Sequence, residues 1–594
     1  MPPLQAAIYS VNNTADFGPG SLRQAVIDVN TNLGADTIQI DPALNGGTIN
    51  LLSSLPALRE NVTIDGPAVG TLTVRFVSLG DIFSGGLGIT KQSAGTLIFS
   101  GVNNYTGGTT INAGVVQGNS WSLKGDIKNN GAVVFDQDVG DGVYTGNING
   151  TGSLTKIGMW KLAMTGANSY AGGTVVNAGL LEGDTDSLQG HIFNNSAVIF
   201  DQAANGTYAG NMYGAGSLTK LGGGTLTLSG YNTYTGLTIV SLGTLQGNSY
   251  SLPSDIVNGS AVVFDQAFDG TYAGKINFRG HVTKQGFGTL TLTGVNSYTG
   301  GTTVSQGTLR GNTISLQGNI SNNAAVVFDQ SFDGTYWGAM SGTGSVTKLG
   351  AGTLTLSGYH TFIGTTTVAA GRLAVNGPIS GAVTVQNGGM LVLAGATVPT
   401  ATLDVTNGAA VLDYPIFGSN PGLEVRQRII AARGGTDLIG TWRGAGITSS
   451  AAAADPSSMS VGYVVNAELP LGPYTTFRGQ PVDATTVLIR GTRIGDATLD
   501  GVVDDNDVTV VGATFGMTSG ANWGLGDFDY DGDVDDNDVT LVGALYNPSA
   551  LPISAPDEAA RAVAAVPEPA SWLMLVWAGV GAALLGWRRR RSES

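Results

Sequence analysis

Twelve aspartates lie between Asp496 and Asp538, in a segment without lysine, arginine or histidine. They form two twelve-residue loops that begin 31 residues apart and share one arrangement. Oxygen-bearing side chains stand at positions 1, 3, 5, 9 and 12, glycine stands at position 6, and position 7 offers its backbone carbonyl. The candidate metal ligands are Asp496, Thr498, Asp500, Val502, Asp504 and Asp507 in the first loop, and Asp527, Asp529, Asp531, Asp533, Asp535 and Asp538 in the second.

This spacing points to calcium. Ca²⁺ takes six to eight hard oxygen ligands at about 2.4 Å, and the loops would wrap their oxygens around one point while Gly501 and Gly532 allow the sharp turn. We therefore expect two Ca²⁺ ions, with the first site looser because Thr498 is a weaker ligand. The alternative is an unstructured acidic linker, which the duplication disfavours. Because uncompensated carboxylates repel one another, calcium removal is expected to unfold residues 491–548 selectively.

Each loop leads into apolar residues at helical spacing. We expect two loop–helix units packed back to back, with Val508, Val511 and Phe515 in the first stripe and Val539, Val542 and Tyr546 in the second. The pair resembles the type I dockerin repeat, with Asp at position 12 and no helix entering each loop. This resemblance implies docking to a cohesin-like partner. Positions 10 and 11 depart from the pattern, since they hold Asp505-Asn506 and Asp536-Asn537 where such dockerins usually carry Ser/Thr-type contacts.

A second group of polar residues recurs through the middle of the chain. It could supply the acids and bases of a polysaccharide lyase or hydrolase, and its tyrosines could bind sugars. An active site needs one convergent group with different roles, whereas these residues recur once per copy. We therefore expect corner caps, surface pairs and packing between coils, and no catalytic residue. The recurring residues are Asp136, Asp201, Asp265 and Asp329; Lys156, Lys220, Lys284 and Lys348; and Tyr144, Tyr208, Tyr272 and Tyr336.

The element that carries them is an internal repeat of about 64 residues over residues 92–376. Short runs of β-formers are separated by glycine, asparagine or aspartate, and no long helical period interrupts them. The pattern predicts a parallel β-solenoid with about three coils of roughly 20 residues in each copy. Glycine, with 92 of the 594 residues, would serve the tight corners.

The copies resemble the autotransporter-associated β-strand repeat. They contain its sequence motif, as in Gly95-Thr-Leu-Ile-Phe-Ser-Gly101 followed by Asn104-Tyr-Thr-Gly-Gly-Thr-Thr110. The resemblance implies a β-helical stalk of secreted and surface proteins. It does not imply an autotransporter, because nothing after residue 377 has the pattern of a C-terminal outer-membrane barrel.

Residues 1–91 are expected to form an N-terminal cap and the first coils. Ser21-Leu-Arg-Gln24 has the pattern of a capping box and predicts a helix to about Asn30. Strands are expected at residues 36–40, 47–51 and 61–65. The sequence of residues 18–25 resembles the N-terminal segment of many bacterial right-handed β-helix surface proteins. The first ten residues show no secretory signal. Residues 377–490 are predicted to be an irregular β-rich cap or connector.

The C-terminal end carries a further pattern. After a linker at residues 549–566, seventeen mostly apolar residues follow a Pro-Glu-Pro run and precede an arginine cluster. That length is at the lower edge for crossing a bilayer, and the arginines would hold the end in the cytoplasm. Residues 567–594 resemble the PEP-CTERM sorting signal, which implies export, membrane retention and processing by an exosortase. The residues that carry the resemblance are Pro567, Glu568, Pro569, Arg588, Arg589, Arg590 and Arg591.

Composition excludes several classes of function. The chain has no cysteine and three histidines, so thiol chemistry and His-rich metal sites are not expected. A net charge of −16 makes nucleic acid a poor partner. We therefore predict an all-β protein, a right-handed parallel β-helix with a small α-helical dockerin-like module and a C-terminal transmembrane helix. It would be an exported structural or adhesive protein of the cell envelope or exterior. The alternatives are a polysaccharide-degrading enzyme, or a polysaccharide-binding protein that docks to a cohesin-like partner.

Overall fold

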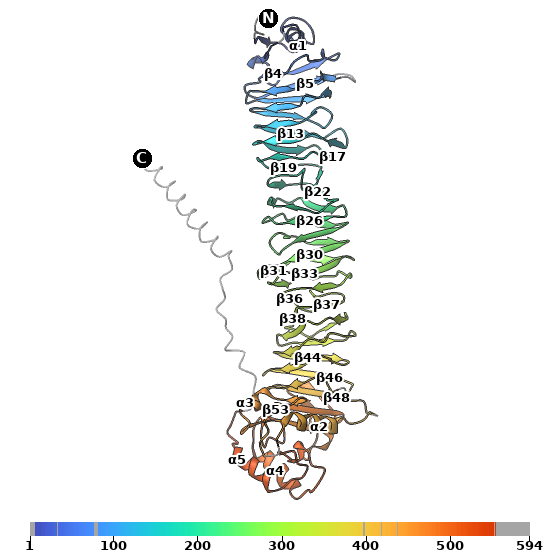
Figure 1. Cartoon of the computed structure of the whole chain (residues 1–594), viewed down its shortest axis with the longest axis vertical. Helices are drawn as coiled ribbons and strands as arrows, with labels where there is room; N and C mark the ends of the chain where they lie inside the picture. Colours follow the sequence, from blue (N-terminus) through green and yellow to red (C-terminus); the bar gives the residue numbers. More distant parts are fainter. Residues whose placement is uncertain are drawn as a thin grey trace, which may run out of the picture.

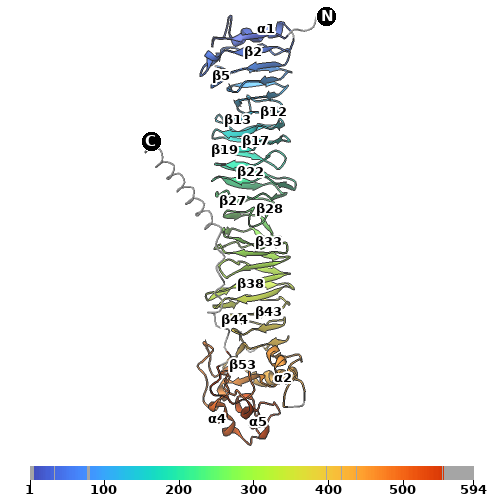
Figure 2. The same cartoon turned by 90° about the vertical axis from the view of Figure 1, so that its left-hand side faces the viewer.

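The computed structural model describes residues 6–553, apart from residues 33, 77–80, 396–397, 417, 436–437 and 552. The chain is an elongated rod with helix α1 (Leu22–Thr31) at one end and helices α4 (Asp505–Thr514) and α5 (Asp536–Leu545) at the other (Figure 1, Figure 2). About 16 turns of parallel β-solenoid make up the rod. The predicted all-β parallel solenoid is confirmed.

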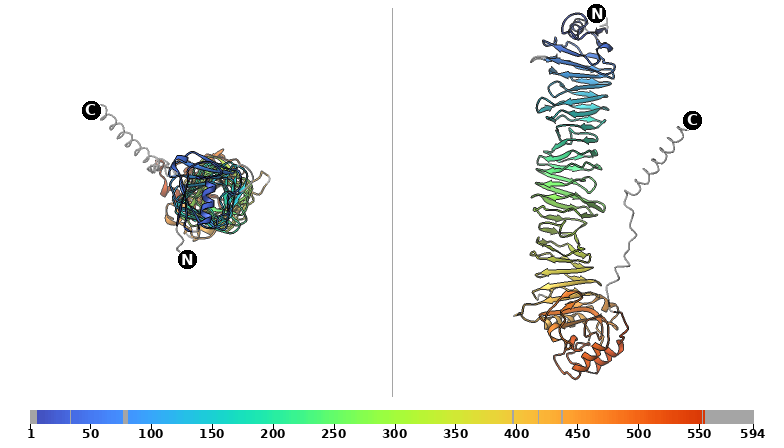
Figure 3. Two further views of the ribbon diagram at one scale, coloured as in Figure 1. Left: turned by 90° about the horizontal axis from the view of Figure 1, so that it is seen from above. Right: turned by 180° about the vertical axis from the view of Figure 1, so that it is seen from behind.

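Each coil has three sides, and each side belongs to a different sheet. Strands β13 (Ala132–Asp136), β14 (Gly142–Tyr144) and β15 (Ile148–Gly150) make one circuit. The next strand, β16 (Ser153–Ile157), lies on β13 in parallel register, with Ala132 opposite Ser153. Seen along the rod, the coils superpose into one compact cross-section (Figure 3).

The repeat does not contain a whole number of coils. From β13 the ladder climbs through β16 and β19 (Thr174–Val176) to β21 (Ile192–Asn194), and the next strand in the chain, β22 (Ala197–Asp201), repeats the sequence of β13 in a different sheet. One copy is therefore three coils and one further side. This corrects the expected three coils of 20 residues, because some steps of the ladder are shorter, as from Leu180 to Ala197. Equivalent residues of successive copies spiral around the rod.

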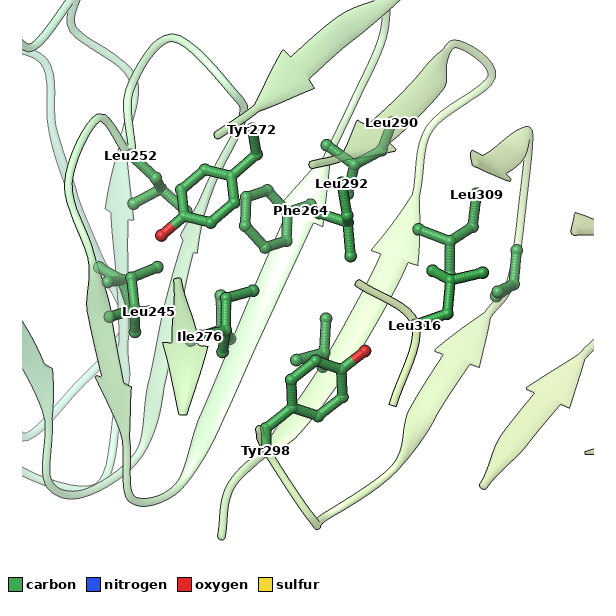
Figure 4. Packing of buried hydrophobic residues seen from close by; sticks show 14 of the residues in the cluster. Leu245, Leu252, Phe264, Tyr272, Ile276, Leu290, Leu292, Tyr298, Leu309 and Leu316 are labelled. Carbon is green, nitrogen blue, oxygen red and sulfur yellow. The ribbon is translucent and has the colours of Figure 1, made fainter. Parts of the chain in front are cut away.

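Alternating side chains of each strand fill the interior. Phe264 packs edge-on against Tyr272, with ring centroids 5.0 Å apart, and Leu245 and Leu290 lie among the buried residues around this pair (Figure 4). The same Phe–Tyr pair recurs in the other copies. The tyrosine set expected to pack between coils does so: Tyr144, Tyr208, Tyr272 and Tyr336 are all buried. None of them is available to stack on a sugar.

Glycine allows neighbouring coils to approach closely at the corners. A Cβ at Gly210 would lie 2.0 Å from the carbonyl oxygen of Gly190 in the coil beside it. Gly190 itself has φ of +66°, a left-handed conformation that favours glycine. The predicted role of glycine at corners is therefore confirmed at these two positions. Gly190 adopts a left-handed backbone conformation, and Gly210 leaves room for the neighbouring coil.

The N-terminal end begins with the predicted helix. Ser21 caps α1 by accepting a hydrogen bond from the Gln24 amide at 3.2 Å. The Gln24 side chain donates to Asp28 Oδ1 at 2.8 Å instead of reaching back, so half of the expected capping box forms. The strands expected nearby are present as β2 (Thr37–Ile40), β3 (Thr48–Leu51) and β4 (Val62–Asp65).

Past the repeats the solenoid continues through β45 (Val383–Val385) to β48 (Ala409–Asp413). Strand β53 (Thr486–Arg493) then pairs antiparallel with β48, and β50 (Met459–Val465) pairs antiparallel with β53. These strands cover the sheet edge that the last coil would expose. The boundary predicted between residues 490 and 491 falls inside β53.

Helix α2 (Gly422–Arg433) was not expected from the sequence, which predicted irregular strands there. Its apolar residues do not form one stripe, because Leu423 and Ile430 are exposed while Val425 and Ile429 are buried. Helix α3 (Ser450–Ala454) is a short run of four alanines that follows a serine.

No helix among the described residues is long and apolar enough to cross a membrane. The predicted transmembrane helix and the sorting signal at Pro567–Pro569 and Arg588–Arg591 lie outside the described residues.

Candidate metal centre

The two acidic loops each end in a capped helix. Asp504 accepts a hydrogen bond from the Asn506 amide at 2.8 Å, and Asp507 accepts one from the Asp504 amide at 2.8 Å, which begins α4. Asp535 and Asp538 repeat both contacts at the start of α5. The aspartate at position 12 is thereby fixed by the first turn of its helix.

The helices bury a different stripe from the predicted one. Val511 and Val542 are buried as expected, whereas Val508 and Val539 are 45% and 43% exposed. Phe515 and Tyr546 follow the helix ends and are also exposed. Val510 takes part in the buried face of α4 instead. The two helices contact each other, as the predicted pairing requires.

The second loop brings its carboxylates together in two groups. Oxygen atoms of Asp527, Asp529 and Asp531 lie within 4.8 Å of one another, and so do those of Asp533, Asp535 and Asp538. Asp527 is fully buried, and its Oδ1 atom has no hydrogen-bond partner. A buried carboxylate oxygen without a donor is costly unless a cation compensates it, so this set fits a hard divalent ion.

The first loop converges on Asp496, which is fully buried. Its carboxylate accepts hydrogen bonds from the Gly501 amide at 2.8 Å and the Asp500 amide at 3.1 Å, and also from the Thr492 hydroxyl. The Thr498 hydroxyl lies 3.4 Å from Asp496 Oδ1. Asp496 is thus better satisfied by the protein than Asp527 is.

Burial makes the ionised form of these carboxyls costly. It raises the pKa of Asp496 and of Asp538 to about 7, with Asp507 adding to the effect on Asp496. It also raises the pKa of Asp507 and Asp527 to about 6. Desolvation and neighbouring negative charge both favour the neutral acid, so a bound cation would reverse the balance in favour of the carboxylates.

Two arginines from outside the loops reach the acidic residues, and sequence spacing gave no signal for them. Arg426 of α2 pairs with Asp527 at 3.1 Å and donates to the Tyr530 carbonyl at 2.9 Å. Arg490 of β53 is buried and donates to the Leu499 carbonyl at 2.6 Å, close to Asp496 in the first loop. The aspartates are therefore partly compensated by the protein itself.

The loops share a core with the strands before them. Trp523 is fully buried, and its Nε1 donates to the Asp496 carbonyl at 2.6 Å. Tyr530 stacks on Tyr463 of β50 with ring centroids 6.3 Å apart, and Tyr474 donates to the Thr498 carbonyl at 2.7 Å. Both loops are held against the capping strands.

The repeated lysines lie inside the solenoid, so the expectation of surface pairs with the aspartates is wrong for them. Lys284 is fully buried, and its Nζ donates to three backbone carbonyls, those of Gln285, Gly286 and Gln306, at 2.9, 2.7 and 3.1 Å. Lys156, Lys220 and Lys348 make the same contacts. Each lysine caps a corner from within, because the carbonyls there point inward.

The repeated aspartates do not converge either. Successive copies of the strand that carries them lie in different sheets, so Asp201 and Asp265 belong to separate sides of the rod. Asp329 pairs with Arg310, and Asp136 accepts from Gln117 at 3.0 Å. These are contacts between adjacent coils.

Comparison with known proteins identifies the repeats. Five segments match the passenger-associated transport repeat: residues 89–117, 154–182, 218–246, 282–310 and 346–375. A segment of 212 residues is 30% identical to the adhesin BmaC autotransporter of Brucella suis biovar 1 (strain 1330); the match covers 30% of this chain and 6% of that protein. No solved structure matches the chain. Five segments of the solenoid are thus similar to a repeat associated with the passenger regions of transported proteins, and part of the chain is similar to an autotransporter adhesin.

Proposed function

We propose that this chain is an exported, surface-exposed structural protein that mediates adhesion. The observation that carries the proposal is the agreement between the stiff solenoid and the segment shared with an autotransporter adhesin. A parallel solenoid offers a long lateral surface and transmits force along its ladder of hydrogen bonds, which suits a protein that holds a cell at a distance from its ligand.

A polysaccharide-cleaving role has less support. The repeated lysines are enclosed and bonded to three carbonyls each, so they cannot act as bases on an external substrate. The repeated aspartates are spread over different sides of the rod.

We further propose that each acidic loop binds one Ca²⁺ in a dockerin-like manner. In the second loop, Asp527, Asp529 and Asp531 would hold the ion, supported by the unpartnered buried Asp527 Oδ1 and by the clustering of these three carboxylates. Asp533, Asp535 and Asp538, which form the neighbouring group, are the further candidate ligands. Asp496, Asp500 and Asp507 would hold the ion in the first. Bound calcium supplies positive charge that keeps the buried carboxyls ionised. The chain's own residues fix the ligands through the caps of α4 and α5.

The proposed location is the cell envelope. The segment from Pro567 to Arg591 would retain the chain at a membrane through one apolar span until an exosortase processes it. This part of the proposal rests on the sequence pattern and is tested separately, by the mass of the mature protein from cells.

Adhesion is tested with cells that express the chain and cells from which its gene is deleted. We expect expressing cells to attach to polysaccharide-coated surfaces, and purified chain to inhibit their attachment without releasing reducing sugar. Equal attachment by both strains would contradict the adhesive function. Release of reducing sugar would favour the enzymatic alternative.

A further inference from the structure

A depression on the side of the rod is lined by residues of the third copy of the repeat. It has a volume of about 310 Å³ and opens between Tyr231 and Tyr250 in the third copy. Tyr231 and Tyr250 are 61% and 54% exposed, and their ring centroids lie 6.2 Å apart with planes inclined by 30°. Leu252 and Tyr272 form its floor and belong to the buried core (Figure 4).

The scaffold beneath the depression is the ordinary one of the repeat. Asn232 bridges two coils by donating to the Ser251 carbonyl at 2.8 Å, as Asn296 does to Ser315 in the fourth copy at 2.7 Å. Asn248 accepts from the Tyr250 amide at 2.9 Å, as Asn312 does from Ile314. The backbone turn is therefore shared, and the difference lies in the side chains placed on it.

Neither tyrosine is part of the repeat pattern. The position of Tyr231 holds Ala167 in the second copy and Val295 in the fourth, and the position of Tyr250 holds Asp186 and Ile314. Only the third copy places an aromatic residue at both positions. A periodic requirement of the fold does not explain the pair, because the other copies form the same coils without it.

A second sequence difference between the copies uncovers the backbone of the turn beside the two tyrosines. In the fourth copy Gln317 folds back over the turn and donates to the carbonyls of Thr313 and Ile314, both at 3.0 Å. Gln189 and Lys124 cover the turn in the same way in earlier copies. The third copy has Pro253 there, which has no side-chain donor. The carbonyls of Ser249 and Tyr250 consequently lack the side-chain hydrogen bonds that their counterparts receive.

We propose that this depression, the tyrosine pocket, binds a neutral glycan. Tilted, exposed tyrosine rings offer flat apolar faces to a sugar ring, and none of the lining residues is charged. The Tyr250 carbonyl accepts from the Asn232 amide at 3.3 Å and has a second lone pair, and the Ser249 carbonyl has no side-chain donor. Both can accept from hydroxyl or N–H donors, which a sugar has in abundance. A proline-rich peptide would also suit aromatic side chains, but proline has no N–H to offer these carbonyls. The inference deepens the proposed adhesive function and rests on it, by naming the ligand class and its place.

The test uses the full-length chain and four variants. Tyr231→Ala and Tyr250→Ala each remove one stacking face. The double variant Pro253→Gln/Ser254→Gly restores the residues of the fourth copy and covers the carbonyls while keeping both rings. Tyr359→Ala is the matched control, since Tyr359 occupies the position of Tyr231 in the fifth copy and is 78% exposed. All of these positions are at the surface or in a turn, and circular dichroism verifies folding.

Binding is measured by affinity electrophoresis and calorimetry with laminarin, xylan and galactomannan, and with alginate and oligoproline for comparison. We expect at least one neutral polysaccharide to bind, with Kd raised tenfold or more in the first three variants and changed less than twofold in Tyr359→Ala. The proposal is overturned if no neutral polysaccharide binds, if all variants bind like wild type, or if only alginate or oligoproline binds. The same variants in the cell-attachment assay separate the two proposals: unchanged attachment rejects the pocket alone, whereas no attachment by wild-type cells rejects adhesion.

Discussion

The buried lysines show how a charged residue becomes part of a solenoid core. Each corner directs three carbonyl oxygens toward one buried ammonium group, which donates to all three. The sequence displayed the lysines as a periodic feature and predicted a structural role. It could not place them inside, because the three carbonyls belong to two different coils.

Replacing Lys284 with methionine is expected to destabilise the solenoid. Methionine keeps the volume of the side chain but leaves three buried carbonyls without a donor, at a cost of roughly 2–4 kcal/mol in unfolding free energy. Lys275→Met, at an exposed position, is the control. Urea denaturation measures both, and equal midpoints for the two variants would contradict the assigned role.

The same lysines predict a pH dependence. Burial lowers the pKa of Lys156, Lys284 and Lys348 to about 8, while the nearby aspartates oppose the shift. In the unfolded chain a lysine has a pKa of about 10.4, so between pH 8 and 10 the unfolded state binds more protons. Stability from these groups therefore rises with pH in that window, by at most about 1.4 kcal/mol per pH unit for each lysine.

Urea midpoints at pH 7.5, 8.5 and 9.5 measure this dependence. We expect the urea midpoint of the wild type to rise with pH, and that of Lys284→Met to rise less steeply. The buried tyrosines oppose this trend as the pH approaches 10, because tyrosine in the unfolded chain then begins to lose its proton while burial raises the pKa of Tyr272 and its equivalents in the folded state. Both proteins contain the same tyrosines, so the difference between the two series of midpoints reports the lysine. A midpoint that falls with pH in both proteins would refute the prediction.

For the candidate metal centre, the spacing predicted that each loop gathers its oxygens around one point, whereas the carboxylates of the second loop lie in two groups. What surrounds the loops was not predicted. Spacing within twelve residues specifies that Asp527, Asp529 and Asp531 gather. Arg426 is 101 residues away in the sequence from Asp527, which it contacts, and Trp523 lies between the two loops in a stretch without a recognisable motif. Their contacts with the aspartates therefore follow from tertiary packing alone.

At the scale of elements, runs of β-formers and turn residues predicted the strands, and the capping-box pattern from Ser21 to Gln24 predicted α1, although only its serine half forms. Helix α2 was not predicted, because its exposed leucine and isoleucine interrupt the helical spacing of its buried apolar residues. The shared core of the loops and β50 also changes an expectation: Tyr530 and Trp523 pack on Tyr463 and Gly462, so the loops are not an isolated module.

Calcium removal is therefore expected to loosen β50 as well as residues 491–548. Hydrogen exchange with mass spectrometry, in calcium and in EGTA, should show faster exchange in residues 459–465 and 491–548, and no change in residues 132–368. At a calcium concentration 100 times Kd the stabilisation would be about 2.7 kcal/mol for each ion bound.

Two variants separate a metal effect from a charge effect. Asp527→Asn removes a proposed ligand and should reduce the response to calcium, whereas Asp536→Asn removes an exposed charge in the same helix region and should preserve it. Identical exchange with and without calcium in the wild type would exclude the proposed ions.

At the scale of the whole molecule, the spiral of equivalent residues follows from the mismatch between the repeat and the coil. Each copy presents its variable positions on the next side of the rod. A residue change in one copy therefore creates a single local feature, such as the tyrosine pocket, and not a stripe. The sequence showed the 64-residue period but not that this period exceeds three coils by one side. No sequence motif distinguishes the coils that contain fewer residues.

This geometry predicts which deletions the rod tolerates. Removing residues 294–357 joins Thr293 to Gly358 and takes out one copy of 64 residues, so each strand still meets a neighbour of the same sequence. The rod should stay folded, lose three coils and one side, and shorten by about 16 Å at about 4.8 Å per coil. Removing residues 294–325, half a copy, joins β34 (Thr289–Leu292) almost directly to the remainder of β38 (Ala325–Asp329). Both strands belong to the same sheet, so no chain is left to form the corners and the other side of the coil between them. Small-angle X-ray scattering measures the maximum dimension of both. A folded half-copy deletion, or an unfolded full-copy deletion, would show that the coils are not held by the register described above.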